Sequence, residues 1–182
     1  MSNPKKLLKS FFPCQECLVW YHGQDSQEAW QTCERGDWML WVAARLGVDR
    51  KLIVLAACDC AETALHFVDP LEIRPKEAVA TARRWCQGAY TSQQVRQAAA
   101  DATAAAYAAD AAAYAADAVA ADDADTADAY AADAATYAAD AYAADAYAAA
   151  AIQSGRAIAS LVRERISWKV ISEAIQKLEN KE

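Results

Sequence analysis

The six cysteines offer the most versatile chemistry in this chain, because thiols bind metals and form disulfides. Cys14 and Cys17 have the Cys-x-x-Cys spacing of zinc sites and of dithiol redox pairs. A structural zinc site needs four ligands, and the chain has neither a second Cys-x-x-Cys nor a His-x-x-x-His. Cys58 and Cys60 would point about 200° apart on a helix, which makes a poor chelate. We therefore predict no metal and no cofactor. A thiol-based metal or redox protein is one of three functional interpretations of this chain.

Two histidines, His22 and His66, are the candidates for general acid–base chemistry. His22 precedes Gly23 and is predicted in a loop, whereas His66 lies in an apolar helical stretch. No serine or cysteine nucleophile motif accompanies either residue, and the chain, with five glycines, has no glycine-rich phosphate loop. We therefore predict that the protein is not an enzyme.

The densest polar cluster is Glu34-Arg35-Gly36-Asp37-Trp38. One interpretation is structural: a helix ends at the glycine, Asp37 caps the next helix, and the opposite charges pair within the chain. The other interpretation makes Glu34, Arg35 and Asp37 part of a partner-binding surface. Four indoles are predicted to lie in the core, with Trp38 and Trp41 as anchors three residues apart on one helix: Trp30, Trp38, Trp41 and Trp85.

Residues 98–151 form an acidic tract built almost entirely from alanine, aspartate, tyrosine and threonine. Alanine fills 34 of the 54 positions and aspartate ten, and no lysine or arginine occurs between Arg96 and Arg156. The tract therefore carries −10, whereas the other 128 residues sum to +3 from 18 basic and 15 acidic side chains. The tetrad Tyr-Ala-Ala-Asp occurs five times and supplies our main candidates for partner binding: Asp110, Asp117, Asp133, Asp140, Tyr114 and Tyr137.

Two interpretations of these tetrads stay open. Tyrosine and aspartate three residues apart are neighbours on a helix surface, so in the first interpretation they form a recognition stripe for a basic protein. In the second, the tract is a low-complexity expansion in which tyrosines fill a helix–helix seam and aspartates keep the outside soluble.

The overall charge and the lack of long apolar runs narrow the class of protein. A net charge of −7 and a pI near 4.9 disfavour nucleic acid and anionic membranes as partners. No apolar run is long enough to span a bilayer, and the apolar run near the N-terminus is too short for a signal peptide. We therefore predict a cytoplasmic protein with reduced thiols.

Glycine, proline and helix-capping residues divide the chain into helices, and no segment shows the alternation of a strand. Asp25 with Glu28, and Thr91 with Gln94, have the spacing of capping boxes, which begin helices. We predict an all-α fold of short antiparallel helices packed with a long Ala-rich helical hairpin. The other predicted boundaries are helix ends at Gly36, Gly47, Asp69-Pro70 and Gly88, caps at Asp37 and Asp49, and a first-turn proline at Pro75.

The hairpin is predicted because a single helix from Thr91 to Arg165 would be roughly 110 Å long at a rise of 1.5 Å per residue. We expect a break at the acid cluster Asp122–Asp125 and a second at Ser154-Gly155. The chain is then one helical domain over residues 1–182. It consists of a Trp-rich helical core at 14–90, an Ala/Asp/Tyr hairpin at 91–153 and C-terminal helices at 154–182.

One tryptophan-rich block is more specific than the rest of the chain: Glu28-Ala29-Trp30-x-x-Cys33-Glu34-Arg35-Gly36-Asp37-Trp38-Met39-Leu40-Trp41. It continues with Asp49-Arg50-Lys51-Leu52, a Leu-Ala-Ala-Cys-Asp-Cys-Ala run at 55–61, Arg74-Pro75 and Ala80-Thr81-Ala82-Arg83. This arrangement, followed by an Ala- and Tyr-rich tract and a short C-terminal helix, resembles a bacterial immunity protein family of polymorphic toxin systems. The resemblance implies a non-enzymatic inhibitor that binds a cognate toxin.

Our first functional interpretation is therefore an immunity protein that neutralises a basic toxin, such as a nuclease, by covering its active site with acidic surface. The second is a structural protein whose Ala-rich hairpins pack against copies of itself as a homo-oligomer. Salt separates the two, because charge-driven binding weakens as salt rises, whereas alanine-mediated association does not.

Overall fold

Every regular element in the described part of the chain is helical, which confirms the predicted all-α class. The computed structural model describes residues 4–67, 70–103 and 148–180. Nine α-helices and one 3-10 turn lie within these ranges, and no strand does. The elements are α1 Pro4–Ser10, α2 Gln15–Tyr21, α3 Ser26–Thr32, α4 Gly36–Arg45, α5 Arg50–Ala64, η1 Leu65–Phe67, α6 Arg74–Cys86, α7 Ser92–Thr103, α10 Ala148–Arg165 and α11 Trp168–Glu179.

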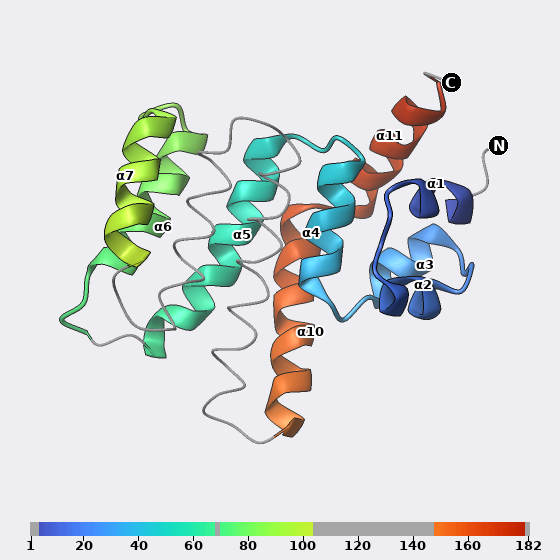
Figure 1. Ribbon diagram of the computed structural model, residues 1–182, viewed down its shortest axis with the longest axis horizontal. Coiled ribbons are helices and arrows are strands. Elements are labelled where there is room, and N and C mark those ends of the chain that lie inside the picture. The colour runs from blue at the N-terminus through green and yellow to red at the C-terminus, as the bar shows by residue number, and fades with distance from the viewer. Residues whose placement is uncertain (1–3, 68–69, 104–147, 181–182) are drawn as a thin grey trace.

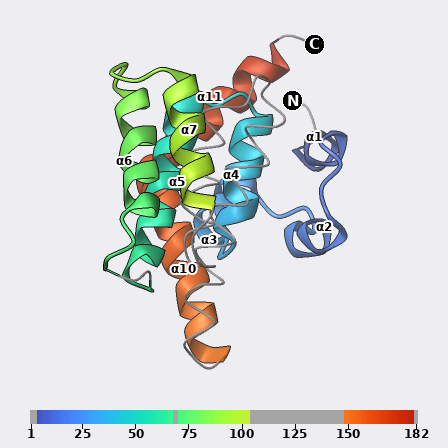
Figure 2. The same ribbon diagram turned by 60° about the vertical axis from the view of Figure 1, so that its left-hand side comes forward.

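The longer helices pack in series, and the short N-terminal helices lie at one end of the series (Figures 1 and 2). Helix α7 packs on α6, α6 on α5, and α5 on both α4 and α10. Helices α1, α2 and α3 gather at the end opposite α7, where α11 contacts α3. Helix α10, which follows the acidic tract in sequence, is therefore a central element of the same core as α4 and α5.

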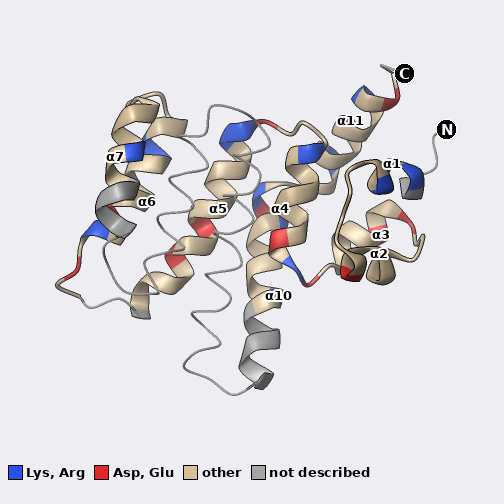
Figure 3. Ribbon diagram, in the orientation of Figure 1, with Lys and Arg blue, Asp and Glu red and all other residues tan. Residues whose placement is uncertain are grey.

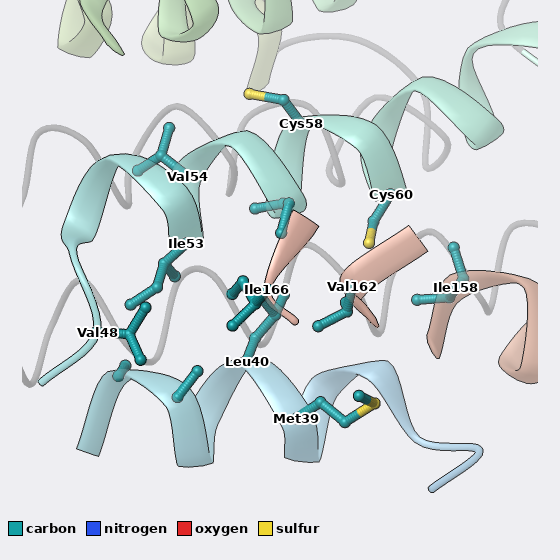
Figure 4. Packing of buried hydrophobic residues seen from close by; sticks show 14 of the residues in the cluster. Met39, Leu40, Val48, Ile53, Val54, Cys58, Cys60, Ile158, Val162 and Ile166 are labelled. Carbon is teal, nitrogen blue, oxygen red and sulfur yellow. The ribbon is translucent and has the colours of Figure 1, made fainter. Parts of the chain in front are cut away.

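The core lies where α4, α5 and α10 meet (Figure 4). Leu40, Val54, Ile158 and Val162 come from these three helices, and each has an exposed fraction of 0 or 1%. Helix α5 also contributes fully buried alanines, whose small side chains let neighbouring helices approach closely: Ala56, Ala57, Ala61 and Ala64.

Several predicted helix boundaries are confirmed by their hydrogen bonds. Asp25 Oδ1 accepts from two backbone N–H groups in the first turn of α3, at 2.9 and 3.1 Å. Asp49 caps α5 by accepting one hydrogen bond, from the backbone N–H of Lys51 at 2.8 Å. Thr91 and Gln94 form a reciprocal capping box, with N–H to side-chain oxygen distances of 2.9 and 3.3 Å. Gly88 follows α6 with a φ of +82°, a conformation that glycine adopts without strain.

Two glycines that were predicted to end helices instead lie inside them, where α4 and α10 approach each other. Gly36 is the first residue of α4, and a Cβ built there would lie 2.5 Å from Ile158 Cγ2. Helix α10 runs unbroken through Gly155, where a Cβ would lie 3.0 Å from the carbonyl oxygen of Glu34. The predicted helix end at Gly36 and the predicted break at Ser154-Gly155 are therefore wrong, because these glycines serve close packing.

The predicted role of Asp37 as a helix cap is also wrong. Arg35 occupies the cap position of α4, and Asp37 lies within the first turn. Acidic residues are favourable there because they face the positive end of the helix dipole.

The predicted hairpin and its break at Asp122–Asp125 lie outside the described residues. The two ends of the acidic tract are described, and both are helical: residues 98–103 end α7, and residues 148–151 begin α10. These two helices occupy different places in the fold, with α7 on α6 and α10 against α4 and α5.

Candidate functional site

The structure pairs two residues that were predicted to bind a partner, Arg35 and Asp37, at the start of α4. Arg35 donates from Nε to Asp37 Oδ1 at 2.9 Å and from Nη2 to Oδ2 at 2.5 Å. This hydrogen bond is the main reason that the pKa of Arg35 lies above its ordinary value. The guanidinium carbon also lies 4.6 Å from the centroid of the Trp38 ring, within the range of a cation–π contact. The predicted intramolecular ion pair is thus confirmed.

The loop between α3 and α4 is fastened to α10 by two arginines. Arg156 Nε donates to Glu34 Oε1 at 2.7 Å, and Arg163 Nη1 donates to the carbonyl oxygen of Cys33 at 2.7 Å. Together with the close approach at Gly36, these contacts hold the loop between α3 and α4, which is part of the Trp-rich block, against α10. The cluster also adjoins the C-terminal end of the acidic tract, since Arg156 is the first basic residue after it.

The six tract candidates, Asp110, Asp117, Asp133, Asp140, Tyr114 and Tyr137, lie outside the described residues. Their assignment to partner binding stays a prediction from the sequence.

Acidic residues of the described helices engage in ion pairs within the fold. Asp59 of α5, with a side chain only 15% exposed, lies 2.6 Å from Arg83 of α6 and 2.8 Å from Arg165 of α10. Arg83 also pairs with Glu62 at 2.8 Å. Figure 3 shows acidic and basic residues interspersed along the described helices rather than segregated as in the tract.

The thiols described here have structural roles, as a helix cap and as buried core residues. Cys14 caps α2 by accepting the backbone N–H of Cys17 at 3.4 Å, so the Cys-x-x-Cys spacing here is that of a helix cap. Cys58 and Cys60 are fully buried and point in different directions, Cys58 toward the Val79 carbonyl oxygen of α6 at 3.9 Å (Figure 4). The predicted divergence of this pair is therefore confirmed.

Burial also controls how these thiols ionise. It raises the pKa of Cys17 and Cys33 to about 11 each. Burial raises the pKa of Cys58 and Cys60 further still. These thiols are therefore protonated at neutral pH. Separately, the described residues contain no group of three or more His, Cys, Asp or Glu side chains that could hold a metal ion.

The histidines lie on separate elements. His22 follows α2 in the left-handed backbone region, with a φ of 31°, and His66 lies in η1 after α5. Both are exposed.

An aromatic-lined pocket of about 110 Å³ lies between the N-terminal helices α1–α3, α4 and α11. Trp20 and Trp38 form one wall, with ring centroids 6.0 Å apart, and Trp30 and Trp168 also line the space. The pocket was not predicted from the sequence, because no helix was predicted over the residues of α1 and α2. The spacing of Leu7 and Leu8 on α1, with Phe11 directly after this helix, was the available signal of an apolar helix face.

Two predicted core anchors, Trp38 and Trp41, are only half-buried, and of these two only Trp38 lines the pocket. Trp38 packs against the edge of the core, where it meets Trp20 and Arg35. Trp41 meets Phe11 edge-to-face at 6.4 Å. The residues of α4 that do enter the core are Gly36, Met39, Leu40, Ala43 and Ala44, so the prediction of Trp38 and Trp41 as core anchors is wrong.

The chain has no significant match to protein-family models, to curated proteins or to solved structures. The family resemblance therefore rests on the residue pattern alone. No helix in the described residues is long and apolar enough to cross a bilayer.

Proposed function

We propose that this protein is a cytoplasmic immunity protein, which binds a cognate bacterial toxin and neutralises it without catalysis. The observation that carries the proposal is the segregation of charge. Ten aspartates lie in residues 98–151, where no basic side chain occurs, while the rest of the chain is slightly basic.

The described acids support this contrast, because several of them already have basic partners within the fold. Asp59 pairs with two arginines, Asp37 with Arg35, and Glu34 with Arg156. The aspartates of the tract have no lysine or arginine within their own segment. An acidic surface of this kind suits a basic partner, because complementary charge accelerates encounter and suppresses wrong partners.

The tyrosines of the tetrads fit the same proposal. Tyrosine is enriched in the buried centres of protein interfaces, where it supplies rigid contact area and one hydroxyl. A toxin whose active site binds a polyanion, such as a nuclease, has the basic cleft that this surface would cover.

A bacterial protection assay tests the proposal. Cells that express the proposed cognate toxin should survive when they also express this protein. Changing Asp110, Asp117, Asp133 and Asp140 together to Asn should abolish survival. A matched control removes an equal number of negative charges from exposed positions on the described helices and should still protect the cells. Its four substitutions are Glu28→Gln, Glu77→Gln, Glu164→Gln and Glu173→Gln.

Equal protection by the two variants would contradict a role for the tract. Self-association of the purified protein that is insensitive to salt, with no toxin binding, would favour the alternative of an Ala-rich oligomer.

A further inference from the structure

The aromatic pocket is a partly open apolar hollow between α1–α4 and α11. Its volume is about 110 Å³. Apolar cavities of roughly 150 Å³ stay dry and bind benzene. The space between α1–α4 and α11 is thus on the scale of one aromatic ring.

The walls of the pocket favour an aromatic ring and disfavour an anion. Four indoles face it, from Trp20, Trp30, Trp38 and Trp168, and aromatic side chains prefer offset or edge-to-face contacts with another ring. The lining includes one charged residue, Glu179, near the C-terminal end of α11. An anion would lose its hydration and would meet the like charge of Glu179 at these walls.

One polar feature interrupts the apolar lining. Tyr21 is 6% exposed, and its hydroxyl meets that of Ser26 at 3.4 Å, a long hydrogen bond. Each hydroxyl donates once and accepts twice, so this pair retains capacity for another partner. Trp30 also has an indole N–H with no acceptor among the described residues, but protein atoms cover it. We therefore assign the polar contact to the two hydroxyls.

We propose that this pocket binds a neutral, ring-sized apolar molecule bearing a hydroxyl, of the phenol class. The ring lies among the four indoles, and its hydroxyl joins the Tyr21–Ser26 pair. This binding is separate from the proposed toxin contact and needs only the protein itself.

Titration of the full chain with phenol, observed through the six indole N–H signals by NMR, locates the binding. Four tryptophans line the pocket, whereas Trp41 and Trp85 do not. Their two signals are identified by Trp41→Phe and Trp85→Phe. We expect saturable shifts at millimolar phenol in the four lining indoles and none in the other two. Shifts that do not saturate, or that affect all six equally, would overturn the proposal.

The hydroxyl contact is tested with phenol and toluene, which differ only in the group attached to the ring. Tyr21→Phe should weaken phenol binding about three- to tenfold, the range expected for one hydrogen bond, and should not weaken toluene binding. The matched control Tyr90→Phe removes a hydroxyl that Arg84 contacts outside the pocket, and should change neither affinity.

Two further variants keep the test decisive. Val42→Phe places a ring in the space and should abolish binding of both probes, with helix content unchanged by circular dichroism. Ser26→Ala should reproduce the effect of Tyr21→Phe if that variant folds poorly. Undiminished phenol affinity in both hydroxyl variants would show that the pair does not recognise the ligand.

Discussion

Gly36 sets how closely α4 and α10 approach, since a methyl group there would lie 2.5 Å from Ile158 Cγ2. Real Cβ atoms do not come so near, and Ile158 is itself 1% exposed and unable to withdraw. Gly36→Ala should therefore lower the free energy of unfolding by about 1–3 kcal/mol, the usual effect of overpacking. Urea denaturation measures this change, and a midpoint equal to or above that of the parent protein would contradict the close approach.

Leu40 and Trp41 are adjacent on α4 but differ in burial. Burial predicts that loss of Leu40 destabilises the fold more than loss of Trp41, the opposite of the order that their sizes suggest. Leu40 is 0% exposed in the core, so Leu40→Ala should cost about 2–5 kcal/mol of stability. Trp41 is half-buried against Phe11, so Trp41→Ala should cost less despite removing more atoms. Parallel denaturation curves compare the two variants. A larger loss of stability for Trp41→Ala than for Leu40→Ala would show that the indole of Trp41 is the main anchor of α4.

The buried thiols make stability fall in alkali. The pKa of Cys17 and Cys33 rises from 9.0 to about 11 on folding, so the folded chain holds these protons where the unfolded chain releases them. Their contribution is fully present below the unfolded value and is lost as pH rises through the folded one. Between about pH 8 and about pH 10.5, stability should fall less in a Cys17→Ala, Cys33→Ala variant than in the parent protein. Exposed Cys14→Ala is the control, and parallel pH profiles for all three proteins would argue against the effect.

At the scale of elements, Asp59 joins three helices, because it pairs with Arg83 of α6 and Arg165 of α10. Asp59→Asn would remove the carboxylate that pairs with Arg165 and leave Arg83 paired with Glu62, which should destabilise the fold by about 1–3 kcal/mol. Glu173→Gln alters a pair 4.0 Å apart on the surface of α11, and should change stability by under about 0.5 kcal/mol. Thermal unfolding compares the two variants. Equal shifts of Tm in both would contradict the role of Asp59 as a link between helices.

Helix starts that depend on local chemistry could be predicted from the sequence, and contacts between distant helices could not. Asp25, Asp49 and the Thr91–Gln94 box bond to backbone groups within four residues, so spacing alone reveals them. Gly36 and Gly155 have the same side chain as a helix-ending glycine, and only the neighbouring helix distinguishes their role. The aromatic pocket was missed for the same reason, since its walls come from five helices.

At the scale of the whole molecule, a slightly basic helical body is joined in one chain to a strongly acidic tract. The body carries +3 and the tract −10, and in the described helices charges of both signs are interspersed. The tract ends in α10, the central helix of the core, so its C-terminal end is fixed to the body at the Glu34–Arg156 pair. An acidic segment held by a stable core is suited to rapid capture of a basic protein.

The most direct test of the proposed function is the rate at which the protein associates with the proposed toxin, measured by stopped flow at rising salt. The parent protein should associate fastest at low salt and slow steeply as salt rises. The variant with Asn at 110, 117, 133 and 140 should associate at least about tenfold more slowly at low salt, and this difference should shrink at high salt. The control with Gln at 28, 77, 164 and 173 should follow the parent protein closely. Equal slowing in both variants, or an association rate that does not depend on salt, would contradict capture by the acidic tract.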